Sequence, residues 1–135
     1  MITRSATTLK TTPGNPDYFT GTVWTTRLVG SDEVSFNTVR VTFEPGARNH
    51  WHTHPGGQLL IATEGRGYVQ KKGESIQLLL PGDTVTILPG EEHWHGATPE
   101  SLFTHIAIQP KIAGKGEVEW LRPVTAEEYT RHPAD

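Results

Sequence analysis

The segment HWHTHPGGQ, residues 50–58, places His50, His52 and His54 at every second position and adds Gln58 after a Pro-Gly-Gly turn. Side chains two residues apart in a β-strand point to the same face, which predicts that the three imidazoles lie together. A buried polar group without a partner costs on the order of 2–7 kcal/mol, and a divalent cation bound by neutral imidazoles removes that cost. The segment therefore predicts one part of a metal site.

Three further histidines fall in predicted strands. His93 and His95 flank Trp94, and His105 shares a predicted strand face with Gln109. Taken singly, each of these histidines could instead face solvent on an open sheet or bond to a carboxylate in the core. Their number favours a shared ligand, because six of the seven histidines in the chain lie in predicted strands.

Short runs rich in Val, Thr, Ile, Phe and Trp alternate with turns built from Gly and Pro, which number 14 and 10. This pattern is typical of an all-β protein, either an antiparallel sandwich or a barrel. Strands are predicted at 19–29, 34–44, 50–54, 58–63, 67–70, 75–80, 84–88, 93–96 and 102–109. The pattern of Thr125 and Glu128 predicts a capping box that opens one short helix at 125–131. We expect the end segments, 1–17 and 131–135, to be irregular.

Length and charge narrow the possible classes of protein. The chain has 135 residues, which predicts one domain spanning 1–135. Lys and Arg number 12 against 15 Asp and Glu and are interspersed with them, so neither nucleic acid nor a membrane is an expected partner. The absence of cysteine excludes disulfides, thiolate ligands and a cysteine nucleophile. The first residues lack the apolar core of a secretory signal, which favours a cytoplasmic location.

The spacing of the candidate ligands resembles a known family. Residues 46–65 resemble the first motif of the cupins, G-x5-H-x-H-x3-E-x6-G, with Gln58 where glutamate is usual. Residues 82–97 resemble the second motif, G-x5-P-x-G-x2-H-x3-N, with Leu88 and Ala97 in place of proline and asparagine. This resemblance implies a cupin double-stranded β-helix, or jelly-roll, barrel with a short C-terminal helix.

The same resemblance implies a site around one divalent metal ion. Its ligands would be His52, His54 and His93 through nitrogen and Gln58 through oxygen. His50 lies outside this set, and we expect it at the rim of the barrel.

Within the cupins, the segments VTFEPGA, WHTHPGGQ, GEEHWHGA and THIAIQ resemble the bacterial manganese-dependent hydroxynitrile lyases. The resemblance implies Mn(II), with Fe(II), Ni(II) or Zn(II) as alternatives, and a small-molecule substrate. It assigns the proton and cyanide roles to His95 and His105 and the cavity wall to Val39, Val41 and Gln109. A homodimer or homotetramer is expected, because the predicted N-terminal strand leaves a sheet edge to cover.

Replacement of the usual glutamate by Gln58 has a chemical consequence. Three neutral imidazoles and an amide leave both charges of a dication uncompensated, which strengthens it as a Lewis acid and disfavours its oxidation. Lyase or acid-base chemistry is therefore favoured over redox cycling. The alternatives are a metal-dependent cupin dioxygenase and a non-catalytic cupin that binds a small ligand.

Overall fold

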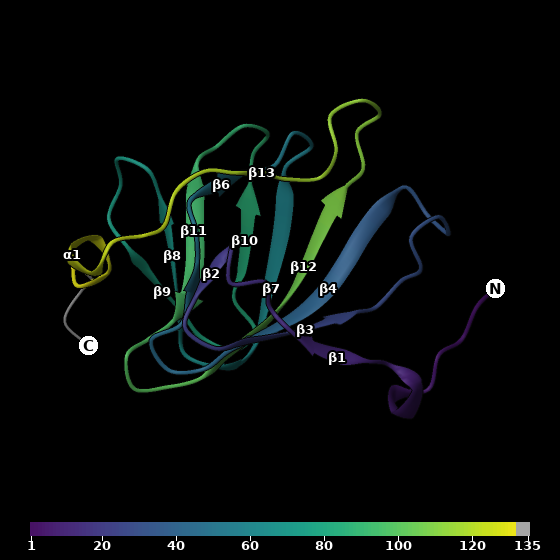
Figure 1. Cartoon of the computed structure of the whole chain (residues 1–135), viewed down its shortest axis with the longest axis horizontal. Helices are drawn as coiled ribbons and strands as arrows, with labels where there is room; N and C mark the ends of the chain where they lie inside the picture. The colour runs from purple at the N-terminus through teal and green to yellow at the C-terminus, as the bar shows by residue number, and fades with distance from the viewer. Residues whose placement is uncertain (132–135) are drawn as a thin grey trace.

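Two antiparallel β-sheets enclose the core in the computed structural model, which describes residues 1–131 (Figure 1). The first sheet contains, in spatial order, β1 (Thr11–Pro13), β3 (Val23–Arg27), β4 (Phe36–Phe43), β12 (Phe103–Pro110), β7 (Gln58–Gly65) and β10 (Thr84–Ile87). The second contains β13 (Glu119–Trp120), β6 (His52–Thr53), β11 (His93–Ala97), β5 (Arg48–Asn49) and β2 (Phe19–Thr20), and β11 also pairs with β8 (Gly67–Lys71), which pairs with β9 (Gln77–Leu79). The all-β architecture predicted from the sequence is confirmed.

The long strands of the first sheet form one wall of the molecule. β12 pairs along its length with β4 and also pairs with β7, which sets His105 opposite Val41 and Ala107 opposite Val39. Alternation along β12 turns His105, Ala107 and Gln109 toward the interior, where all three are buried. The wall thus carries several candidate site residues on its inner face.

Apolar residues fill the space between the sheets beside this polar group. Phe43 and Phe103 stack with ring centroids 6.3 Å apart, and Val69 and Leu79 of the second sheet belong to the same cluster. Burial of this cluster stabilises the sandwich, since each large apolar side chain contributes about 1.5–3 kcal/mol when fully buried. The strands that carry the histidines are therefore held together by a packed apolar core.

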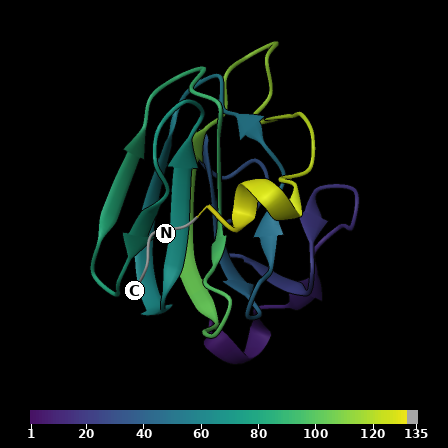
Figure 2. The same ribbon diagram turned by 90° about the vertical axis from the view of Figure 1, so that its left-hand side faces the viewer.

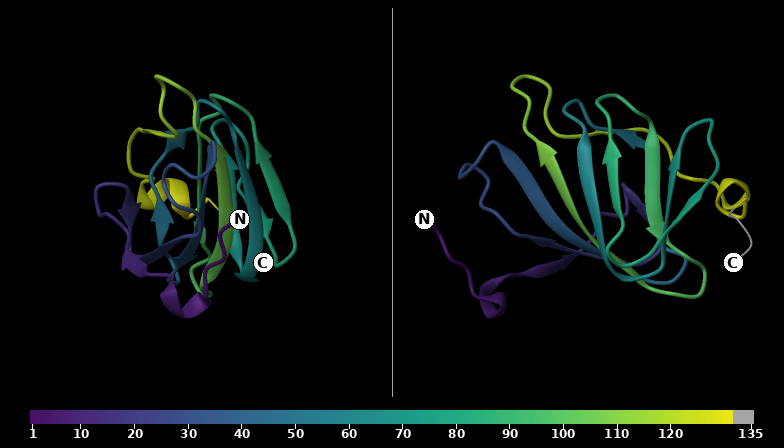
Figure 3. Two further views of the ribbon diagram at one scale, coloured as in Figure 1. Left: turned by 90° about the vertical axis from the view of Figure 1, so that its right-hand side faces the viewer. Right: turned by 180° about the vertical axis from the view of Figure 1, so that it is seen from behind.

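The helix α1 (Ala126–Tyr129) packs on the outer side of the second sheet (Figure 2). The predicted capping box is present: Thr125 Oγ1 accepts from the Glu128 amide at 3.0 Å, and Glu128 Oε1 accepts from the Thr125 amide at 2.9 Å. Tyr129 donates its hydroxyl to the Ala97 carbonyl at 2.7 Å, which fastens the helix to β11. The 3-10 helix η1 (Ala6–Thr8) lies at the opposite end of the molecule (Figure 3).

The prediction of one regular strand over residues 50–54 is wrong. Arg48 pairs with Gly96 and His52 pairs with His93, so four steps along one strand oppose three steps along its partner. The extra residue is a bulge, which separates β5 from β6 around His50 and shifts the alternation of side chains. His50 therefore does not share a strand face with His52.

The predicted strand 19–29 is also divided, between the two sheets. Gly21 lies between β2 and β3 with φ of 82°, and a Cβ there would come within 2.9 Å of the Ala47 Cβ. Only glycine accepts this backbone conformation and this close approach at low cost. The chain turns at Gly21 and enters the first sheet.

The chain ends add little to the site. Within the segment expected to be irregular, 1–17, Thr11–Pro13 forms β1 and pairs with β3. Of the expected C-terminal end, 132–135 lies outside the described residues. Across residues 1–131, no helix has the length and apolar character needed to cross a membrane.

Candidate metal centre and active-site cavity

A cavity of about 180 Å³ lies between the sheets at the histidine-rich end. Its first-sheet wall includes Val39, Val41 and Gln109, the three residues that the sequence predicted to line a pocket. The cavity is smaller than the roughly 300–1,000 Å³ of drug-sized ligand sites, which suits a small substrate. A larger surface hollow of about 490 Å³ beside α1 is lined mainly by charged and polar side chains and by none of the predicted site residues.

Three buried histidines share one hydrogen-bonding arrangement. The Nδ1 atoms of His52, His54 and His93 lie 2.7, 2.6 and 3.0 Å from backbone carbonyl oxygens. A carbonyl oxygen only accepts, so each Nδ1 must carry the proton and each Nε2 of the neutral ring keeps a lone pair. This is how metal-binding histidines are held in proteins, with the outer nitrogen bonded and the other free to coordinate.

The rings of these three residues, called here the carbonyl-held histidines, lie close together. The centroid of His52 is 4.2 Å from that of His93 and 5.0 Å from that of His54. Of the described residues, none offers a hydrogen-bond partner to the buried Nε2 of His54. An orphaned buried nitrogen of this kind fits a metal ligand.

Gln58 faces His93 across a short gap. Gln58 Nε2 donates to Gln109 Oε1 at 3.2 Å, which turns Gln58 Oε1 toward His93 Nε2, 3.1 Å away. Because the His93 proton is on Nδ1, this contact joins two acceptors with no hydrogen between them. A cation between the two atoms would resolve the conflict.

A second pair of histidines is bonded differently. His105 Nε2 lies 3.0 Å from His95 Nδ1, and the side-chain nitrogen of Asn49 lies 3.2 and 3.1 Å from the two ring nitrogens of His95. Asn49 Oδ1 also accepts from the His95 amide at 2.9 Å. We call His95 and His105 the paired histidines, because one ring must donate to the other.

One nitrogen each from His52, His93 and His95 also lie within 4.8 Å of one another. The geometry thus contains two overlapping ligand groups that share His52 and His93. One is completed by His54 and Gln58, and the other by His95.

Burial holds all five imidazoles neutral at physiological pH. Desolvation lowers the pKa of His93 to about 4 and that of His105 to about 3, well below the ordinary value of about 6.5. Burial, followed by the neighbouring histidines, lowers the pKa values of His52 and His95 far below that value. The pKa of His54 is lowered by burial as well. Neutral rings can bind a cation or accept a proton.

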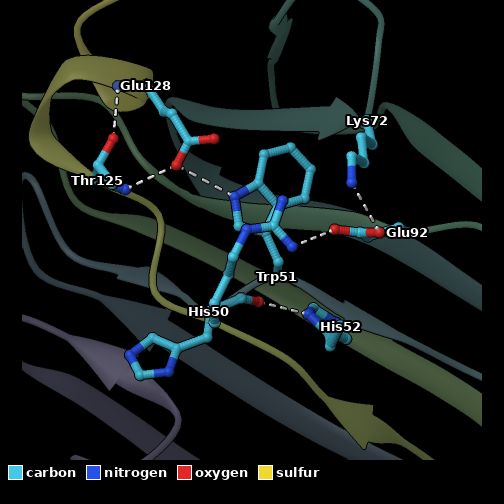
Figure 4. A network of polar contacts seen from close by, with 8 residues as sticks. His50, Trp51, His52, Lys72, Glu92, Thr125 and Glu128 are labelled. Carbon is cyan, nitrogen blue, oxygen red and sulfur yellow. Dashed lines mark hydrogen bonds and ion pairs between the residues drawn. The ribbon is translucent and has the colours of Figure 1, made fainter.

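His50 contributes its backbone, not its ring, to the site. In Figure 4 its imidazole points away from His52 while its carbonyl accepts the His52 hydrogen bond. The neighbouring Trp51 donates through Nε1 to Glu128 Oε1 at 3.4 Å, and this hydrogen bond links residues 50–52 to α1 (Figure 4). His50 is absent from the residues that line the 180 Å³ cavity.

Sequence reasoning missed several residues of the cavity, among them Asn49 and Trp120. Asn49 was not among the predicted site residues; it lies just before the bulge and contacts His95. Trp120, from β13, stacks on Tyr18 with ring centroids 4.6 Å apart and also lines the cavity. No local pattern in the sequence announces a bulge at this point.

Comparisons with known proteins identify the family of the chain. Residues 39–104 match the family model described as the cupin domain. An (R)-mandelonitrile lyase of Granulicella tundricola is 49% identical over 119 residues, which is 87% of this chain and 90% of that protein.

Solved structures of cupin proteins are also similar to this chain. A cupin-like protein from Thermotoga maritima superposes with a TM-score of 0.85 at 44% identity, over 91% of this chain and 94% of that one. A cupin-2 domain protein from Rhodospirillum rubrum has a TM-score of 0.72 at 15% identity, over 96% and 84% of the two chains, which indicates a shared fold alone.

Proposed function

The chain belongs to the cupin family, and from that premise we propose that it is a metal-dependent hydroxynitrile lyase, which reversibly cleaves a cyanohydrin into an aldehyde or ketone and hydrogen cyanide. The observation that carries the proposal is one small cavity that contains two groups of polar side chains. His52, His54 and Gln58 offer acceptor atoms that suit a cation, and they lie beside the neutral pair His95 and His105. The relative named as (R)-mandelonitrile lyase supports an aromatic cyanohydrin as the substrate.

The proposed ligands are His52, His54 and His93 through Nε2 and Gln58 through Oε1. Two facts support this set over the group that contains His95. His54 Nε2 is an orphan within residues 1–131, whereas the ring nitrogens of His95 already contact Asn49 and His105. A cation would also relieve the acceptor-to-acceptor contact of Gln58 with His93.

We propose Mn(II) as the resident ion, since nitrogen and oxygen ligands without sulfur suit it. When bound to this neutral ligand set, the ion would act as a Lewis acid and lower the pKa of a hydroxyl group that binds it. The protein contributes the fixed tautomers of the carbonyl-held histidines and a partly apolar wall that includes Val39 and Val41.

The paired histidines are assigned the proton chemistry. In cleavage, the substrate O–H bond breaks toward His95, the carbon–carbon bond breaks with its electron pair on the cyanide carbon, and the carbonyl double bond forms. The proton returns from the His95–His105 pair to cyanide, which leaves as hydrogen cyanide. A neutral pair in hydrogen-bond contact can hold that proton at either ring, and Asn49 keeps His95 in place.

Mandelonitrile cleavage and synthesis by the purified manganese-loaded protein test the proposal. We expect turnover in both directions, one enantiomer in excess in synthesis, and no turnover above background in His52→Ala. Background rates in the loaded wild-type protein, or oxygen consumption in place of cyanide release, would contradict it.

A further inference from the structure

The acceptors of the carbonyl-held histidines come from different distances along the chain. His52 and His93 donate to the carbonyls of His50 and Glu91, each two residues earlier in the same segment. His54 instead donates to the carbonyl of Glu117, 63 residues later. The tautomer of His54 therefore depends on tertiary structure, whereas those of the other two are set locally.

Glu117 belongs to the segment between β12 and β13, residues 111–118, which we call the strap. Two residues of the strap, Glu117 and Val118, line the cavity. Glu117 makes two contacts there: its carbonyl accepts from His54 Nδ1 at 2.6 Å, and its Oε2 accepts from Asn37 Nδ2 at 3.2 Å. Asn37 lies on β4 and is only 7% exposed. One residue thus joins the strap to a ligand of the proposed site and to the opposite sheet.

A third contact holds the strap near its start. Ile112 packs against Gly56, in the turn that follows His54, where an added Cβ would come within 3.0 Å of Ile112 Cδ1. Backbone hydrogen bonds from Lys115 and Gly116 to the Ile112 carbonyl, 3.0 and 3.1 Å long, close the strap on itself. The strap is therefore a compact turn that rests on the segment carrying His54.

We propose that Glu117 is a positioning residue for the metal centre: its side chain, held by Asn37, fixes the strap so that its carbonyl keeps His54 Nε2 directed at the ion. The inference rests on the ligand set of the proposed function. A carbonyl acceptor holds the proton on Nδ1 only while it stays within hydrogen-bond distance, and partners of this kind are worth about 10–100-fold in metal affinity. If the position of the strap affects metal affinity, metal binding must affect the strap by the same free energy. A bound ion should therefore also order the strap.

The test is a titration of metal-free protein with Mn²⁺, followed by electron paramagnetic resonance of the free ion. Glu117→Ala and Asn37→Ala should each weaken Mn²⁺ binding about three- to tenfold, less than loss of the carbonyl itself would. The double variant should bind no more weakly than either single variant, because both remove the same contact. Glu117→Gln keeps an acceptor for Asn37 and should stay within about twofold of wild type.

Two controls separate positioning from general damage. Glu119→Ala removes an exposed carboxylate two residues further along and should leave Mn²⁺ affinity unchanged. Trypsin cleavage after Lys115, which is exposed in the strap, should slow about fivefold when wild-type protein is saturated with Mn²⁺. Cleavage after Lys72, outside the strap, should not change. Glu117→Ala should lose the protection at Lys115.

The outcomes distinguish the two claims. Wild-type affinity and wild-type protection at Lys115 in Glu117→Ala would overturn the positioning role and leave the lyase proposal standing. Weakened Mn²⁺ binding in that variant without mandelonitrile turnover by the loaded wild type would support the positioning role and overturn the lyase. Failure of the wild-type protein to bind Mn²⁺ would overturn both.

Discussion

Two sets of buried histidines lie in and beside the cavity, and they differ in what their rings bond to. The carbonyl-held set, His52, His54 and His93, donates Nδ1 protons to backbone oxygens, which can never return a proton. The paired set, His95 and His105, is bonded ring to ring. Burial is the same for both sets, since every one of these side chains is at most 3% exposed.

The two sets differ in hydrogen-bond partners and not in burial, and our proposed roles for them rest on that difference. A backbone acceptor fixes one tautomer and leaves one inward lone pair, which suits a metal ligand. A ring-to-ring contact permits either tautomer, which suits proton transfer. The predictions below test whether variants of the two sets separate in the same way.

Loss of a carbonyl-held histidine should have the largest effect. His52→Ala removes a ligand at the centre of the cluster, so we expect loss of bound manganese and a fall of activity to background. Elemental analysis and the mandelonitrile assay measure the two effects, and chelation of the wild-type protein should reproduce both. Full manganese occupancy in the variant would remove His52 from the ligand set.

Loss of a paired histidine should leave the metal in place. His95→Ala and His105→Ala should each bind manganese like wild type while kcat falls about 10²–10⁴-fold, the range for general acid-base residues. Elemental analysis beside steady-state kinetics separates the two sets. Loss of manganese from His95→Ala would favour the alternative ligand group that contains His95.

Asn49 should have a smaller effect, through His95. Asn49→Ala removes both the contact with the His95 ring and the acceptor for its amide, and we expect kcat to fall about tenfold with manganese occupancy unchanged. Asn49→Asp keeps the acceptor for the amide but cannot donate to the ring. Recovery of wild-type kcat in Asn49→Asp would show that the ring contact is dispensable.

The pH dependence of stability should give the smallest effect. Folding lowers the pKa of His93 to about 4 and that of His105 to about 3, from about 6.5 in the unfolded chain, so the unfolded chain binds more protons below pH 6.5. Stability of the metal-free protein is therefore full above that pH and falls as pH drops toward 3. Each of these two histidines should lower the free energy of unfolding by roughly 0.5–1 kcal/mol between pH 7 and pH 6.

Urea unfolding of the metal-free protein at pH 7.5, 6.5 and 5.5 measures this slope. His105→Gln removes one of the titrating rings and should flatten the dependence. Stability that is independent of pH across this range would mean that the histidines are not held neutral by burial.

The sequence was sufficient for the fold class, but it was insufficient to tell which side chains around β5 and β6 face inward. Alternating patterns and Gly-Pro turns predicted most strands of both sheets but not β1, β5 or β13. The Thr125–Glu128 capping box is present in the structure. Alternation failed at the bulge between β5 and β6, because an extra residue changes which side chains face inward. It therefore grouped His50 with His52.

Hydrogen-bond partners that are distant along the chain could not be predicted from the sequence either. The contact of His54 with Glu117 depends on how the segment after β12 returns across the cavity, and the contact of His95 with Asn49 depends on strand register. Glu117 lies outside both motifs, and Asn49 occupies an unspecified position of the first motif. Such partners are set by tertiary packing, which local propensity and spacing do not encode.

The central claim is tested most directly by a crystal structure of the manganese-loaded protein with anomalous diffraction at the manganese absorption edge. The account predicts one anomalous peak within bonding distance of the Nε2 atoms of His52, His54 and His93 and of Gln58 Oε1, with His95 still bonded to His105. A peak bound by His95 in place of His54, or no peak between these side chains, would contradict it.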